Sequence, residues 1–142
     1  MNDAIKKLLP QHKFDIERAN GIVSCGDPAV ETILPELVEW LRDYNWPVAH
    51  VLSPFLANIG LPIVPAIHYV LQTDDDIWKY WLLLCIVDKS SLDVAESLRG
   101  ELTRIATQPT KGEILEEVNV IAQEILENWR GFSYKYEFIF EI

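Results

Sequence analysis

The segment from Trp46 to Thr73 contains no Asp, Glu, Lys or Arg, and this restricts what the chain can fold into. Such a segment is either a membrane hairpin or the buried middle of a soluble protein. Four prolines and Gly60 interrupt it, so no apolar run approaches the roughly 20 residues that a membrane-spanning helix requires. We therefore expect this segment to lie in the middle of a soluble helical stack.

Apolar residues recur at helical spacing through nearly the whole chain. The residues after Pro47 place apolar side chains at i, i+3, i+4, i+7 and i+8, as one buried face of a helix requires. These are Val48, Val51, Leu52, Phe55 and Leu56. Taken over the chain, the same spacing predicts one continuous core. We expect it to include Val51, Phe55, Ile67, Trp81, Leu84 and Ile125.

Polar residues mark the starts of several predicted helices. Asp74-Asp75-Asp76 precedes an apolar run and lacks the ligand spacing of a calcium loop, so it predicts a helix N-terminus. Thr110 and Glu113 have the spacing of a capping box and open the last helix. In that helix the periodicity places Leu115 on the inner face and Glu113 on the outer face.

The predicted helices follow one another in pairs joined by short turns. The first helices of successive pairs begin near Lys13, Trp46 and Asp76, roughly 30 residues apart, which is in the range of helical-repeat proteins. We therefore predict an all-α fold of stacked antiparallel helix hairpins, a short HEAT/ARM-like α-solenoid. A chain of 142 residues fits a single domain, 1–142, with a helical body over 1–130 and an extended tail over 131–142.

From Phe132 to Ile142, aromatic residues and Ile142 alternate with Ser133, Lys135, Glu137, Ile139 and Glu141, a period of two that predicts a β-strand. A helical body provides no strand partner for it. Three arrangements stay open. The tail packs back on the helices in extended form, it pairs with the tail of a second copy, or it is disordered, and six apolar side chains on one face favour the first two. The expected assembly is accordingly a monomer or a homodimer through the tail.

Several strings in this sequence resemble one family. They are Leu8 to Asp15 (LLPQHKFD), Ile33 to Leu37 (ILPEL), Trp40 to Asp43 (WLRD), Asn45 to Ala49 (NWPVA), Asp74 to Trp81 (DDDIWKYW), Pro109-Thr110, and Glu116 to Val118 (EEV). Together they are similar to the bacterial domain of unknown function 5071 family over about Leu8 to Leu126. The resemblance implies an all-helical, HEAT-like fold and implies no reaction.

The net charge of −10 restricts the partners. An acidic chain repels phosphate backbones and anionic lipid, so we expect neither nucleic acid nor a membrane surface. A basic protein or peptide suits the charge. Cys25 and Cys85 lie in different settings and do not form a disulfide framework. The first residues lack the apolar stretch of a signal peptide, so the expected location is cytoplasmic.

The sequence carries no recognisable catalytic or cofactor motif. His12, His50 and His68 have no ligand partner at the spacing of a metal site, and we expect neither metal nor cofactor. No Ser or Cys stands in a nucleophile elbow, and no glycine-rich phosphate loop is present. We therefore predict that the chain is not an enzyme.

Acidic and aromatic residues outside the predicted core stripes are the candidate contact set. They are Glu36, Glu39, Trp40, Asp43, Trp46, His68, Tyr69 and Gln72. Partly exposed aromatics are typical anchors of recognition surfaces, although they also serve local packing. We expect a noncatalytic module that binds a protein or peptide and, by analogy, an immunity or adaptor protein. Two alternatives stay open: a small enzyme with an acid or histidine site, and a structural homo-oligomer.

Overall fold

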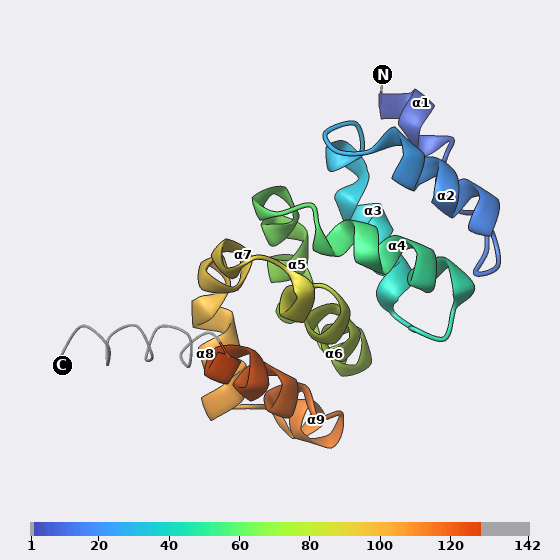
Figure 1. The fold of residues 1–142 in the computed structure, drawn as a ribbon. Coiled ribbons are helices and arrows are strands. Elements are labelled where there is room, and N and C mark those ends of the chain that lie inside the picture. Colours follow the sequence, from blue (N-terminus) through green and yellow to red (C-terminus); the bar gives the residue numbers. More distant parts are fainter. Residues whose placement is uncertain (1, 129–142) are drawn as a thin grey trace.

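The computed structural model describes residues 2–128, and these residues form an all-helical body without a β-strand (Figure 1). The α-helices and short 3-10 helices (η) are α1 (Asn2–Lys6), α2 (Ile16–Cys25), η1 (Glu31–Ile33), α3 (Leu34–Val38), η2 (Glu39–Leu41), α4 (Pro47–Ala57), η3 (Leu61–Ile63), α5 (Val64–Leu71), α6 (Asp76–Cys85), η4 (Val87–Lys89), α7 (Leu92–Ser97), α8 (Arg99–Thr107) and α9 (Lys111–Leu115). A further helix spans residues 118–128. The tail 131–142 and its predicted strand lie outside the described residues.

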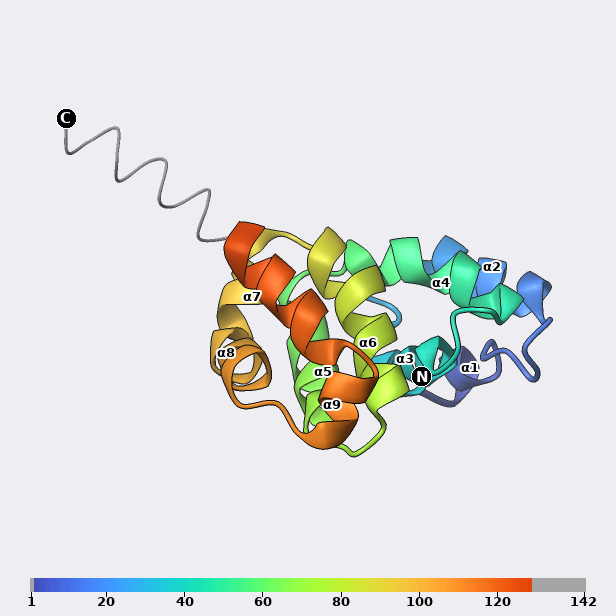
Figure 2. The same ribbon diagram turned by 90° about the horizontal axis from the view of Figure 1, so that it is seen from below.

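The helices follow one another along the molecule, from α1 and α2 at one end to α8 and α9 at the other (Figures 1 and 2). Neighbours pack on each other: α2 contacts α4, α3 contacts α5, and α6 contacts both α4 and α5. The charge-free segment supplies α4, η3 and α5 in the middle of this succession. No helix of the described chain is long and apolar enough to span a membrane. The all-α prediction is confirmed, and the division into HEAT-like units stays a prediction.

The predicted helix starts are confirmed where a polar side chain caps the backbone. Asp75 precedes α6, and its carboxylate accepts the amide hydrogen of Trp78 at 3.1 Å. Thr110 and Glu113 form both halves of the capping box before α9. Because a cap joins groups only three residues apart, the local sequence suffices to predict it.

The core is one continuous cluster of buried apolar side chains. Ile67 and Ile125 lie inside it as predicted. The prediction was wrong for four residues that are only half-buried: Val51, Phe55, Trp81 and Leu84. Helix α4 shows the reason: the small residues Ala49, Ser53 and Ala57 are buried beside its large ones. They turn the buried face by part of a helical turn and leave Val51 and Phe55 at its edge.

The last predicted helix is two helices, since α9 ends at Leu115 and the next helix begins at residue 118. Between them Glu117 has a positive φ of 62°, which no α-helix contains. Periodicity cannot be carried across such a break. The predicted faces are therefore wrong on both counts, since Leu115 is 78% exposed and Glu113 is fully buried.

Candidate functional site

A hollow of about 350 Å³ lies where α3, η2 and the turn before α4 meet the N-terminal segment. We call it the Trp40 hollow. Its lining residues are Leu9, Pro10, Glu36, Glu39, Trp40, Arg42 and Trp46. Four of them, Glu36, Glu39, Trp40 and Trp46, belong to the contact set predicted from the sequence. The structure therefore brings half of that set to one place.

Local backbone structure explains why these side chains meet. Helix α3 runs directly into η2, and helical spacing places Glu36, Glu39 and Trp40 on one face. Trp46 precedes Pro47, which favours an extended backbone at that residue. Its ring packs edge-to-face against Trp40, with ring centroids 5.9 Å apart and an interplanar angle of 70°. Aromatic pairs prefer this geometry to a face-to-face sandwich.

The charges of the hollow are unequal, because two carboxylates share it with one guanidinium. Arg42 Nη2 is 3.9 Å from Glu39 Oε1, and its guanidinium lies 4.4 Å from the centroid of the Trp78 ring. Glu36 has no such neighbour. Its Oε2 atom is buried and has no hydrogen-bond partner among the described residues. A buried carboxylate oxygen in this state lacks the hydrogen bond that buried polar atoms normally have.

A second hollow of about 450 Å³ adjoins the first and shares Glu39 with it. Pro35, Val38 and Trp78 line it from one side, and Pro65, Ala66 and Tyr69 line it from α5. Tyr69 is 68% exposed, so its ring is available at the surface. A fifth member of the predicted contact set thus lies next to the Trp40 hollow.

The remaining three predicted residues line neither hollow and have local partners. Asp43 accepts the amide hydrogen of Asn45 at 2.8 Å, which stabilises the turn before α4. His68 hydrogen-bonds to Gln72, the residue that follows the end of α5, and its Nε2 is 3.7 Å from Glu101 Oε1. These contacts account for Asp43, His68 and Gln72 as parts of the fold.

Sequence reasoning missed an ion cluster formed by Asp76, Lys79, Arg104 and Glu113, here called the Glu113 cluster. Lys79 Nζ donates a hydrogen bond to Glu113 Oε2 at 3.0 Å. It also lies 2.7 Å from Asp76 Oδ1, where the two groups form an ion pair without hydrogen-bond geometry. Arg104 donates two hydrogen bonds to Glu113, at 3.0 and 2.7 Å. A lone lysine in the otherwise apolar run 77–87 was the signal for a buried acid partner.

The carboxylate of Glu113 is fully satisfied by the protein. Burial by itself would raise its pKa, but hydrogen bonds from Arg104, the Thr110 amide and Lys79 outweigh this and lower the pKa to about 2. Every donor comes from α6, α8 or the cap of α9. The Glu113 cluster therefore joins three helices, and the fold itself explains it.

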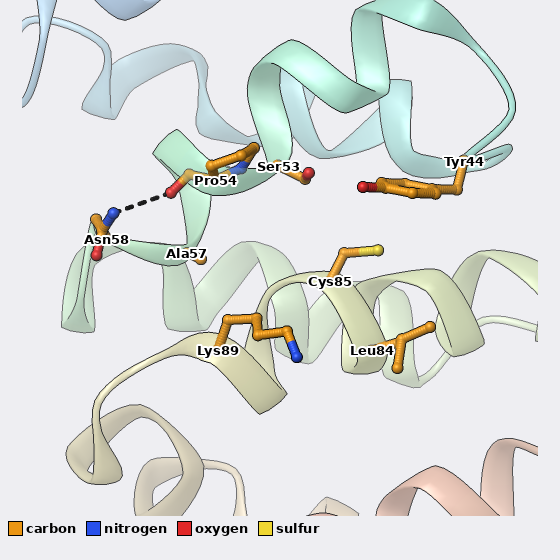
Figure 3. A pocket seen from close by; sticks show the side chains of 8 residues that line it. All are labelled: Tyr44, Ser53, Pro54, Ala57, Asn58, Leu84, Cys85 and Lys89. Atoms are coloured by element: carbon orange, nitrogen blue, oxygen red, sulfur yellow. Dashed lines mark hydrogen bonds between the residues drawn. The ribbon is translucent and has the colours of Figure 1, made fainter.

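A groove of about 580 Å³ lies between α4 and α6 (Figure 3). Its lining residues are Tyr44, Ser53, Pro54, Ala57, Asn58, Leu84, Cys85 and Lys89. Burial raises the pKa of the Cys85 thiol to about 11, even though the nearby Lys89 lowers it. The thiol is therefore protonated near neutral pH and is a poor nucleophile.

The titratable groups form no evident metal site. In the described part of the chain, no three His, Cys, Asp or Glu side chains gather where a metal ion would bind. His50 instead stacks on Tyr44, with ring centroids 4.2 Å apart. His68 contacts Gln72 and Glu101, as described above.

Comparison with known proteins gives a family and no described activity. No protein of curated function matches the sequence. A family model does match it, over residues 8–126, which is most of the chain and includes both the Trp40 hollow and the Glu113 cluster. The chain therefore belongs to the family described as a domain of unknown function (DUF5071).

Proposed function

We propose that this chain is a noncatalytic binding module that accepts a lysine or arginine side chain of a partner protein in the Trp40 hollow. The observation that carries the proposal is the buried Oε2 atom of Glu36, which has no hydrogen-bond partner among the described residues and belongs to a side chain that lines the hollow with Trp40 and Trp46. A protein interior rarely leaves such an acceptor unused.

The chemistry of the hollow favours a cation over other ligands. A buried acceptor without a donor costs about 1–3 kcal/mol, and an incoming ammonium or guanidinium group removes that cost. The face of a tryptophan ring also attracts a cation. Glu39 adds a second carboxylate, and the overall charge of −10 draws basic partners toward the surface. The contacts of Arg42 in this region are with Glu39 and the Trp78 ring.

A basic protein segment is the partner that presents such side chains in series. The adjoining hollow with Tyr69 extends the contact surface beyond one residue. An immunity or adaptor protein that holds a basic partner would use a surface of this kind, and we assign that role by analogy.

A noncatalytic role agrees with the state of the reactive side chains. A catalytic cysteine needs a low pKa, whereas burial raises that of Cys85. His68 is half exposed and paired with Gln72 and Glu101, and neither of these side chains is a nucleophile of the Ser or Cys type. We therefore favour the binding module over an enzyme with an acid or histidine site.

Titration with fluorescein-labelled hexalysine tests the proposal. We expect Glu36→Gln to weaken binding about fivefold to tenfold, because the variant loses a charged acceptor. Glu127→Gln changes the net charge equally at an exposed position far along the chain, and we expect it to have little effect. In NMR spectra, the indole N–H signals of Trp40 and Trp46 should move more than that of Trp81. Equal weakening by both substitutions would mean that charge alone attracts the peptide, and the proposed site would be wrong.

A further inference from the structure

The groove between α4 and α6 differs in chemistry from the rest of this acidic molecule. Lys89 contributes a cation to its lining, and no Asp or Glu lines it. The remaining lining is mainly apolar or uncharged, with Pro54 and Ala57 on α4 and Leu84 on α6. Lys89 is thus the charged residue of this lining among the described residues, in a chain with net charge −10.

We propose that this groove is a ligand site for a small organic anion with an apolar body, such as a medium-chain carboxylate. The site is separate from the Trp40 hollow. Evidence against it would leave the function proposed above unaffected. Its volume of about 580 Å³ lies in the range of small-molecule sites, which are mostly apolar with a few placed polar groups.

Lys89 provides the anion-binding end. Figure 3 shows its side chain extending along the groove toward Cys85 and Leu84. Its Nζ is 3.3 Å from Oδ2 of the neighbouring Asp88, a pair that is exposed on the lysine side and is therefore weak. Burial keeps the Cys85 thiol neutral by raising its pKa to about 11, so this side chain does not repel an anion.

Ser53, on α4, adds a hydroxyl group to the lining of the groove. Figure 3 shows this hydroxyl and that of Tyr44 directed toward each other across the groove. Both hydroxyls can exchange hydrogen bonds with water or with a polar group that enters this part of the groove.

The Tyr44 ring closes the groove at the end opposite Lys89 (Figure 3). It stacks on the Trp81 ring, with ring centroids 5.4 Å apart, and it also packs against the His50 ring. These contacts join α4 to α6 through aromatic rings. An apolar ligand body lying over Leu84 and Ala57 would therefore end against a ring held in place by its neighbours.

Octanoate and 1-octanol, which share an apolar chain and differ in charge, form the test. With ¹⁵N-labelled protein, we expect octanoate to shift the amide signals of Ala57, Leu84 and Cys85 in a saturable way. We expect 1-octanol to bind several-fold more weakly. Lys89→Gln should reduce octanoate affinity about threefold to tenfold and leave 1-octanol affinity unchanged, since only the anion meets the ammonium group. Lys89→Arg should retain binding.

Lys111→Gln is the matched control, because it removes one exposed lysine outside the groove. Equal loss in Lys89→Gln and Lys111→Gln would assign the affinity to overall charge and overturn the proposal. So would equal binding of octanoate and 1-octanol, or amide shifts confined to other parts of the molecule. Protein mass is measured in parallel. A dimer that buries Ala57 and Leu84 would make the groove an interface between copies and would equally contradict the proposal.

Discussion

Glu113 and Glu36 are two carboxylates with buried oxygens, and their surroundings are opposite. Glu113 receives hydrogen bonds from Arg104, Lys79 and the Thr110 amide, all from within the chain. Glu36 Oε2 receives none from the described residues. One carboxylate has all its donors inside the fold, and the other keeps a free acceptor beside two tryptophan rings.

This difference distinguishes a carboxylate that stabilises the fold, Glu113, from one that is available to bind a partner, Glu36. A carboxylate whose donors are built into the structure holds elements together, and its removal leaves buried cations unpaired. A carboxylate with a free buried oxygen contributes nothing comparable to folding, because no internal contact is lost when it is removed. The free acceptor is therefore the better candidate for recognition, and the predictions below test this division.

The largest expected effect is that of Glu113→Ala. The substitution removes the shared partner of Lys79 and Arg104, and breaking a buried ion pair from one side costs about 3–5 kcal/mol. Urea denaturation should show this loss in the free energy of unfolding. A loss below about 1 kcal/mol would place Glu113 among surface acids, contrary to its complete burial.

Acid should remove the same stabilisation without mutation. The folded pKa of Glu113 is about 2, below its ordinary value of 4.5, so its contribution is fully present above that ordinary value. It is lost as pH falls from about 4.5 to 2, and it amounts to about 3 kcal/mol. The check compares the unfolding free energy of the protein with that of Glu113→Gln across this range. The two curves should converge toward pH 2, and parallel curves would contradict the assignment.

A smaller effect is expected from Gly112→Ala. A methyl group at Gly112 would overlap the Asp76 carboxylate, which must then move from its ion pair with Lys79. We expect a loss of about 1 kcal/mol. Gly100→Ala in α8 is the control, because its methyl group meets no atom and should stabilise the helix by about 0.5–1 kcal/mol. Thermal denaturation of both variants measures this. If the melting temperatures of Gly112→Ala and Gly100→Ala shift in the same direction, the Glu113 cluster tolerates displacement of Asp76.

The smallest effect on stability is expected from Glu36→Ala, the same chemical change as Glu113→Ala at the other carboxylate. We expect no loss of stability and a gain of up to about 1 kcal/mol, because the substitution removes a buried acceptor that has no donor among the described residues. Urea denaturation measures it beside Glu113→Ala. A loss near that of Glu113→Ala would show that Glu36 has an internal role, and the distinction between the two carboxylates would disappear.

Much of the fold was predictable because its signals are local. The caps at Asp75 and Thr110, the start of α4 after Trp46 and the charge-free middle of the molecule all depend on residues within one or two helical turns. The candidate site was predictable in part, since Glu36, Glu39 and Trp40 share a face through helical spacing alone. The sequence could also assign the family, because the match covers residues 8–126.

Tertiary structure decided which of these residues have partners. Lys79 and Glu113 are 34 positions apart, and only the packing of α6 against α9 brings their charges together. The turn at Glu117 changes the helix direction between Leu115 and the buried residues after it, so the inner face of the later helix does not extend back to Leu115. Trp40 and Trp46 meet because the turn between η2 and α4 folds back. Helix formation depends on neighbours along the chain, whereas the pairing or isolation of a buried charge depends on distant groups that periodicity does not register.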